Sequence, residues 1–126
     1  MRPIRVLVVD DSETDRLRIG GVLRAAGFEV FSLPSPIGVT REVTEKEIDV
    51  VVLDVNMPSL RGDSLAKLVK SDPAFDGLRV ILISATSADT IAELARAVNA
   101  DGWLRKDELY TRLVAMVSEL GSSADD

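Results

Sequence analysis

The chain has 126 residues, which is enough for one domain built around a single core. Its 21 acidic residues outnumber its 15 Lys and Arg residues, and the net charge of −6 argues against direct nucleic-acid binding and against binding to an anionic membrane surface. Neither Cys nor His occurs, which excludes disulfides, thiol- or histidine-based catalysis and Cys- or His-ligated metals, so any bound metal would be a hard cation such as Mg²⁺ or Ca²⁺.

The apolar runs of the chain are all far shorter than a membrane span. The N-terminal run is also too short for a signal peptide and has no small-residue cleavage site. We therefore expect a cytoplasmic protein that does not insert into a membrane.

Five apolar runs have the composition of β-strands. The first, third and fourth are rich in Val and Ile and hardly alternate with polar residues, a pattern typical of strands that are covered on both faces of a parallel sheet. The expected strands are 4–9, 28–33, 48–53, 80–83 and a short one at 103–104.

Helical patterns separate these strands. Ser12 or Thr14 can cap the first helix, and Gly27 can close it in the left-handed conformation that favours glycine. The Ser-Pro pair at 35–36 is typical of a cap followed by the first helical residue, so we expect a second helix from there toward Glu47.

Three more helices follow. Asp63 or Ser64 can open the third, and the Asp-Pro pair at 72–73 would end it. The next two are predicted from apolar residues at helical spacing, which are Ile91, Leu94, Ala95 and Val98 in the fourth and Leu109, Leu113, Met116, Val117 and Leu120 in the fifth.

The alternation of five strands with five helices predicts an α/β fold, an open doubly wound parallel sheet with helices on both faces. We expect one domain over residues 1–120, followed by a small, acidic and disordered tail at 121–126. In such sheets ligands bind at the carboxyl ends of the strands, so the residues that end each strand matter most.

The expected strand ends carry a coherent set of polar side chains. Asp10 and Asp11 end the first strand, Asp54 ends the third, Ser84 follows the fourth and Lys106 comes shortly after the fifth. Each residue taken singly could be a helix cap or a loop residue, but together they place three carboxylates, a hydroxyl and an ammonium at one edge. A cluster of acids of this kind favours binding of a divalent cation.

These motifs, VVDDS, VVLDVNMPSLRG, LISAT and DGWLRKD, resemble those of the receiver domain of bacterial two-component response regulators, of the single-domain chemotaxis type. The resemblance extends over residues 4–120, and the expected fold is the flavodoxin-like (βα)5 sheet with strand order 2-1-3-4-5. It implies that Asp54 accepts a phosphoryl group, and that Ser84 and Lys106 bind the phosphoryl oxygens.

The same resemblance implies a Mg²⁺ site and a switch. Asp10, Asp11, Asp54 and the backbone carbonyl of Asn56 would hold the ion, and Trp103 occupies the position of the switch aromatic, which is usually Tyr or Phe. Ser84 would follow the phosphoryl group and make room for that ring.

Two positions depart from the commonest family pattern. Asp107 stands where a Pro usually follows the lysine, so we expect a trans peptide bond and a carboxylate that can compete for Lys106. Trp103 is larger than the usual aromatic residue, and it is either a switch with a damped movement or a static packing residue.

The leading hypothesis is a phosphorylation-controlled signalling switch and not a turnover enzyme. A histidine kinase or phosphotransfer protein would donate the phosphoryl group, and a downstream protein would bind the face made by the fourth helix, fifth strand and fifth helix, with homodimerisation on phosphorylation as a further outcome. Two alternatives remain, a phosphorylation-independent adaptor with the same fold and a phosphohydrolase whose nucleophile is Asp10.

Overall fold

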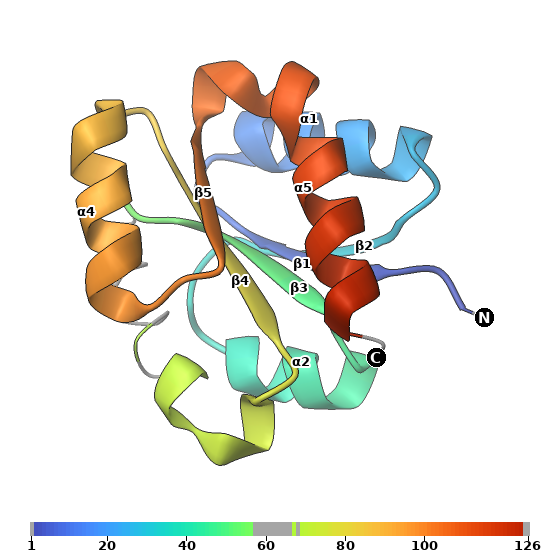
Figure 1. Cartoon of the computed structure of the whole chain (residues 1–126). Helices are drawn as coiled ribbons and strands as arrows, with labels where there is room; N and C mark the ends of the chain where they lie inside the picture. Colours follow the sequence, from blue (N-terminus) through green and yellow to red (C-terminus); the bar gives the residue numbers. More distant parts are fainter. Residues whose placement is uncertain (1, 57–66, 68, 125–126) are drawn as a thin grey trace.

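A computed structural model describes residues 2–56, 67 and 69–124 of the chain, and its centre is one five-stranded parallel sheet (Figure 1). The strand order is β2-β1-β3-β4-β5, which confirms the predicted doubly wound topology. The strands are β1 Arg5–Val9, β2 Glu29–Leu33, β3 Val50–Asp54, β4 Arg79–Ser84 and β5 Gly102–Arg105.

Helices cover both faces of this sheet (Figure 1). One core layer joins the sheet to α1 and α5, and the other joins it to α2 and α4. The helices are α1 Glu13–Ala25, α2 Val39–Lys46, α4 Ala88–Val98 and α5 Leu109–Ala124, with the 3-10 turns η1 Pro73–Phe75 and η2 Lys106–Glu108. In the part of the chain that the structure describes, no helix is long and apolar enough to cross a membrane.

The alternation of side chains along each strand divides the core between the two layers. In β1, Val6 and Val8 pack toward α1 and α5, whereas Leu7 and Val9 pack toward α2 and α4. All four side chains are fully buried, which explains why the sequence shows an unbroken apolar run here. The sheet is thereby held rigidly between two helical layers, and its carboxyl edge is a fixed platform.

The first helix begins and ends as the sequence predicts. Of the two candidate caps, Ser12 is the one used, since its side chain accepts a hydrogen bond from the backbone N–H of Asp15. Gly27 follows the helix with a φ of +95°, in the left-handed region.

The predicted start of the second helix was wrong. Helix α2 begins at Val39, behind Gly38, whose φ is +89°. Ser35 does not cap it, because its hydroxyl accepts a hydrogen bond from the N–H of Ile37 and closes a local turn instead. The left-handed backbone at Gly38 then separates that turn from the helix.

The sequence also predicts the start of a third helix and the end of the last one. The expected opening of the third helix at Asp63 or Ser64 lies outside the described residues, although the chain is no longer helical at Asp72, ahead of Pro73. Helix α5 continues to Ala124, so residues 121–124 are helical and not the disordered tail that the sequence predicts. Gly121 is buried in this last turn and approaches Ile4.

Candidate functional site

Four strand ends meet at the carboxyl edge of the sheet. Asp10 directly follows β1, Asp54 ends β3, Ser84 ends β4 and Lys106 follows β5. Because β1, β3, β4 and β5 are parallel neighbours, their carboxyl ends lie side by side (Figure 1). The structure therefore brings together the residues that strand-end reasoning selected.

The acidic cluster consists of Asp10, Asp11 and Asp54, each of which offers one carboxylate oxygen within 4.8 Å of the others. Asp10 and Asp54 are buried, whereas Asp11 is exposed. In both buried acids Oδ1 accepts a hydrogen bond from the backbone N–H two residues on, from Ser12 at 2.9 Å and from Asn56 at 3.0 Å. The turn after each strand thus fixes one oxygen and leaves Oδ2 for the cluster.

Lys106 reaches into this cluster from the end of β5. Its Nζ lies 2.9 Å from Asp10 Oδ2 and 3.5 Å from Asp54 Oδ2. The nearest oxygen is neither of these but Asp15 Oδ2 in the first turn of α1, at 2.7 Å. The peptide bond between Lys106 and Asp107 is trans, as predicted, and Asp107 pairs with Arg105 instead of competing for the lysine.

Asp15 is a functional-site residue that the sequence reasoning missed. It lies on a helix and not at a strand end, so the pattern of polar residues at the strand ends does not include it. A signal was present, because α1 starts directly after β1 and its first turn must stay near the carboxyl edge. An acid three residues after the Ser12 cap is therefore placed beside the site.

The pKa values of the cluster reflect burial and charge. Burial raises the pKa of Asp54, and the neighbouring Asp10 carboxylate raises it further, while the Asn56 N–H and Lys106 oppose both effects. The hydrogen bond from Lys106 lowers the pKa of Asp15. Burial lowers the pKa of Lys106, but its hydrogen bond to Asp15 and its close contact with the Asp10 carboxylate outweigh burial and hold that pKa above its ordinary value.

Ser84 is fully buried and its hydroxyl is held by three contacts. Its Oγ accepts hydrogen bonds from Asn56 Nδ2 at 2.9 Å and from the N–H of Thr86 at 3.0 Å, and lies 2.8 Å from Thr86 Oγ1. Since two N–H groups occupy its lone pairs, Ser84 must donate its own hydrogen to Thr86. A movement of Ser84 toward Asp54 has to break this arrangement.

The donor set of the acidic cluster fits Mg²⁺. The side-chain ligands are all carboxylate oxygens, which hard cations prefer, and the burial of two of them makes an uncompensated cluster costly. Asp10 Oδ2 is buried without an aligned hydrogen-bond donor, although the Lys106 ammonium lies beside it. The predicted contribution of the Asn56 carbonyl to the site stays a prediction.

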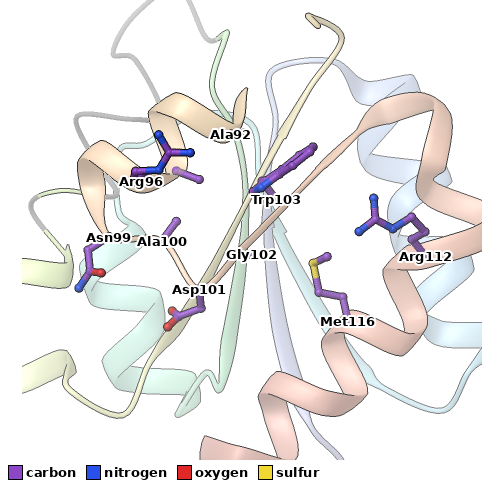
Figure 2. A pocket seen from close by; sticks show the side chains of 10 residues that line it. Ala92, Arg96, Asn99, Ala100, Asp101, Gly102, Trp103, Arg112 and Met116 are labelled. Atoms are coloured by element: carbon purple, nitrogen blue, oxygen red, sulfur yellow. The ribbon is translucent and has the colours of Figure 1, made fainter. Parts of the chain in front are cut away.

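Trp103 lies on β5, on the sheet face covered by α2 and α4, and is half-buried. It lines a hollow of about 490 Å³ between α4 and α5. Figure 2 shows its ring between Arg96 on one side and Arg112 and Met116 on the other. This hollow belongs to the face made by α4, β5 and α5.

The sequence of the chain matches a known protein family. A family model described as the response regulator receiver domain matches residues 6–118. The transcriptional regulatory protein PrrA of Mycobacterium tuberculosis is 36% identical over 127 residues, which cover 95% of this chain and 52% of that protein. A gliding motility regulatory protein of Myxococcus xanthus is 33% identical over 112 residues, which cover 89% of this chain and only 14% of that protein.

Solved structures agree with this match. The chemotaxis protein CheY4 of Vibrio cholerae superposes with a TM-score of 0.84 at 25% identity, covering 94% of this chain and 99% of that one. A receiver domain protein from Clostridium thermocellum superposes with a TM-score of 0.85 at 27% identity, covering 97% of both chains. The chain thus spans about half or less of these two curated relatives but nearly all of these two solved structures.

Proposed function

Because the chain belongs to the response regulator receiver domain family, we propose that it is a phosphorylation-controlled switch that accepts a phosphoryl group on Asp54 from a histidine kinase or a phosphotransfer protein. The observation that carries the proposal is the pairing of a buried Asp54 carboxylate with Lys106 at the carboxyl edge of the sheet. In this proposal the protein works in the cytoplasm, as a signalling component and not as a turnover enzyme.

Asp54 is arranged to act as the nucleophile. Its Oδ1 is held by the Asn56 N–H, so Oδ2 is the oxygen that forms the new P–O bond. As that bond forms, the P–N bond of the donor phosphohistidine breaks, and the imidazole leaves with the electron pair and takes up a proton. Phosphoryl transfer needs little more from a protein than this alignment and the neutralisation of charge.

Three acids would hold Mg²⁺ beside that oxygen, namely Asp10, Asp11 and Asp54, together with the carbonyl of Asn56. When bound, the ion supplies positive charge that offsets the repulsion between the carboxylates and the phosphoryl oxygens. Lys106 supplies a second positive charge from the end of β5, at the same edge of the sheet.

Ser84 and the α4-β5-α5 face would carry the response. The Ser84 hydroxyl leaves Asn56 and Thr86 to bind a phosphoryl oxygen, and Trp103 on the adjacent strand β5 responds to the vacated space. The changed face then binds a downstream protein or a second copy of the chain. Arg96 and Arg112 border this face and favour an acidic partner segment.

A phosphorylation-independent adaptor is the second candidate. It is favoured by one observation, that the closest partner of Lys106 is Asp15 and not the acceptor Asp54. An adaptor would keep this arrangement permanently and bind its partner in one conformation.

Trapping with beryllofluoride, a mimic of the phosphoryl group, separates the two candidates. The switch predicts a bound fluoride species by ¹⁹F NMR that requires Mg²⁺ and is absent in Asp54→Asn. The Asp76→Asn variant is a matched control, because Asp76 is an exposed acid next to η1, beyond the far end of the sheet. Absence of any bound fluoride species in the wild type would support the adaptor.

A further inference from the structure

The shortest contact of Lys106 is not with the proposed acceptor. Its Nζ lies 2.7 Å from Asp15 Oδ2 and 2.9 Å from Asp10 Oδ2 but 3.5 Å from Asp54 Oδ2, so the ammonium lies closer to α1 and the end of β1 than to Asp54. The side chains of Lys106 and Asp15 are only 15% and 21% exposed, and solvent therefore screens this ion pair less than it screens a pair on the open surface.

Asp15 is itself fixed in place. Its Oδ1 is paired with Arg18 one turn further along α1, at 3.1 Å, and its backbone N–H donates to the Ser12 cap. Each carboxylate oxygen of Asp15 therefore lies beside a cation. The backbone of Asp15 is anchored at the start of the helix. Asp15 is a preorganised partner for Lys106 and not a mobile surface acid.

We propose that Asp15 is a positioning residue that holds Lys106 toward α1 and competes with the phosphoryl group on Asp54 for this lysine. The inference rests on the proposed function, because it concerns the same phosphoryl group. A lysine ammonium is a compact charge on a flexible stem, and it can approach a new anion only by lengthening its contact with the old one. The charge of Asp15 thus sets how strongly the protein binds the phosphoryl group, without any change in Asp10 or Asp54.

The test compares the affinity for beryllofluoride, in excess Mg²⁺, of the wild type and Asp15→Asn. The amide keeps the shape of the carboxylate and removes its charge, so we expect binding to become about three- to tenfold tighter, the range for one partly shielded ion pair. Glu13→Gln is the matched control, since Glu13 is an exposed acid in the same turn of α1 and the change in net charge is identical. This control should bind within about twofold of the wild type.

A double-mutant cycle shows whether the effect passes through the lysine. Lys106→Met keeps most of the length of the side chain and removes its charge, and it should weaken beryllofluoride binding. In that background Asp15→Asn should no longer change the affinity. Asp15→Ala provides a second variant if the amide finds a new hydrogen bond, and the far-UV circular dichroism of every variant must match that of the wild type.

The outcomes distinguish a failure of the proposed function from a failure of the inference about Asp15. If the wild type binds no beryllofluoride, the proposed function fails and the inference fails with it. If the wild type binds and Asp15→Asn binds equally or more weakly, only the inference is overturned, because Asp15 then assists the lysine or has no effect on it. An effect of Asp15→Asn that persists with Lys106→Met also overturns it, since the cause is then general charge repulsion.

Discussion

At the scale of single residues, Asp54 combines a proposed chemical role with an energetic cost. Its carboxylate is almost fully buried beside Asp10, and both burial and that neighbour raise its pKa. The folded protein therefore holds a proton on Asp54 more tightly than the unfolded chain does. The contribution of Asp54 to the free energy of unfolding must therefore fall as the pH rises from the ordinary value of 3.8 through the raised one.

Replacing Asp54 by Asn should consequently leave stability unchanged near neutral pH or raise it by about 1–2 kcal/mol. The gain should shrink in acid, where protonation removes the charge of the wild-type carboxyl and so lowers the cost of burying it. Urea unfolding of both proteins at neutral pH and at about pH 4 measures this difference. A variant that is clearly less stable at neutral pH would show that the ion pair with Lys106 outweighs burial.

Asp15 should show the opposite dependence on pH. Lys106 lowers the pKa of Asp15, so the pair contributes stability above the ordinary value of 3.8, and that contribution is lost as the pH falls through the lowered value. Without Mg²⁺ or a phosphoryl mimic, Asp15→Asn should lower the free energy of unfolding at neutral pH by up to about 1 kcal/mol and have little effect in strong acid. Urea unfolding across this pH range, with Glu13→Gln as control, measures how the stability loss depends on pH. An equal loss in the free energy of unfolding at all pH values would contradict the prediction.

Ser84 is the residue whose contacts would have to change in the proposed switch. Ser84→Ala should cost only about 1 kcal/mol of stability, because its partners Asn56 and Thr86 are exposed and water can replace the lost hydrogen bonds. Urea unfolding measures the cost, with Ser32→Ala as the control, because Ser32 is an exposed serine of β2. A loss above about 3 kcal/mol would mean that the hydroxyl is chiefly a structural group of the core.

How much of the site could be predicted depends on where each residue lies. Asp10, Asp54, Ser84 and Lys106 could be grouped from the sequence, because parallel strands bring their carboxyl ends to one edge whatever the details of packing. Asp15 could be placed near this edge, because α1 starts directly after β1. Its contact with Lys106 could not be predicted, because it depends on the direction of the first turn of α1, which strand order leaves open.

At the scale of elements, the strands were predicted more accurately than the helix ends. A buried parallel strand carries its signal over the whole apolar run, whereas a helix start depends on one or two residues that can serve several local structures. The Ser-Pro pair at 35–36 satisfies the preference for a helix start, but it closes a turn, and α2 begins only at Val39. The end of α5 was missed for a similar reason, since small polar residues near a terminus leave helix and coil nearly balanced.

Two helical glycines should respond oppositely to substitution by alanine. A Cβ on Gly21 in α1 meets nothing within 4 Å, so Gly21→Ala should raise stability by about 0.5–1 kcal/mol through the lower entropy of the unfolded chain. A Cβ on Gly121 in α5 would come within 2.7 Å of the Ile4 side chain, so Gly121→Ala should destabilise. Thermal unfolding compares them, and equal shifts in the same direction would show that α5 does not pack on Ile4 as described.

At the scale of the whole molecule, the carboxyl edge of the sheet and the α4-β5-α5 face are linked through β4 and β5. Ser84 pairs with Arg105 in the sheet register, and Trp103 lies two residues before Arg105 on the same strand. Because Ser84 and Trp103 lie on these two paired strands, the path from Ser84 to the hollow that Trp103 lines is short.

Trp103 emission should report this link, since Trp103 is the only tryptophan of the chain. Repacking a bulky indole costs about 1–3 kcal/mol when space is short, which is comparable to the gain at the phosphoryl group, so we expect a partial shift of population. Beryllofluoride with Mg²⁺ should change the emission and quencher access, and Ser84→Ala should reduce the change. Identical emission despite confirmed binding at Asp54 would make Trp103 a static core residue.

The most direct test of the account is phosphorylation of the intact protein by acetyl phosphate with Mg²⁺, followed by intact-mass analysis. The proposed function predicts one acid-labile phosphoryl group in the wild type, none in Asp54→Asn and none when Mg²⁺ is removed by a chelator. Asp49→Asn is a suitable comparison, because Asp49 is a buried carboxylate before β3, at the opposite end of that strand from Asp54, and should leave the modification intact. A wild-type protein that stays unmodified, or an Asp54→Asn protein that still gains the phosphoryl group, would contradict it.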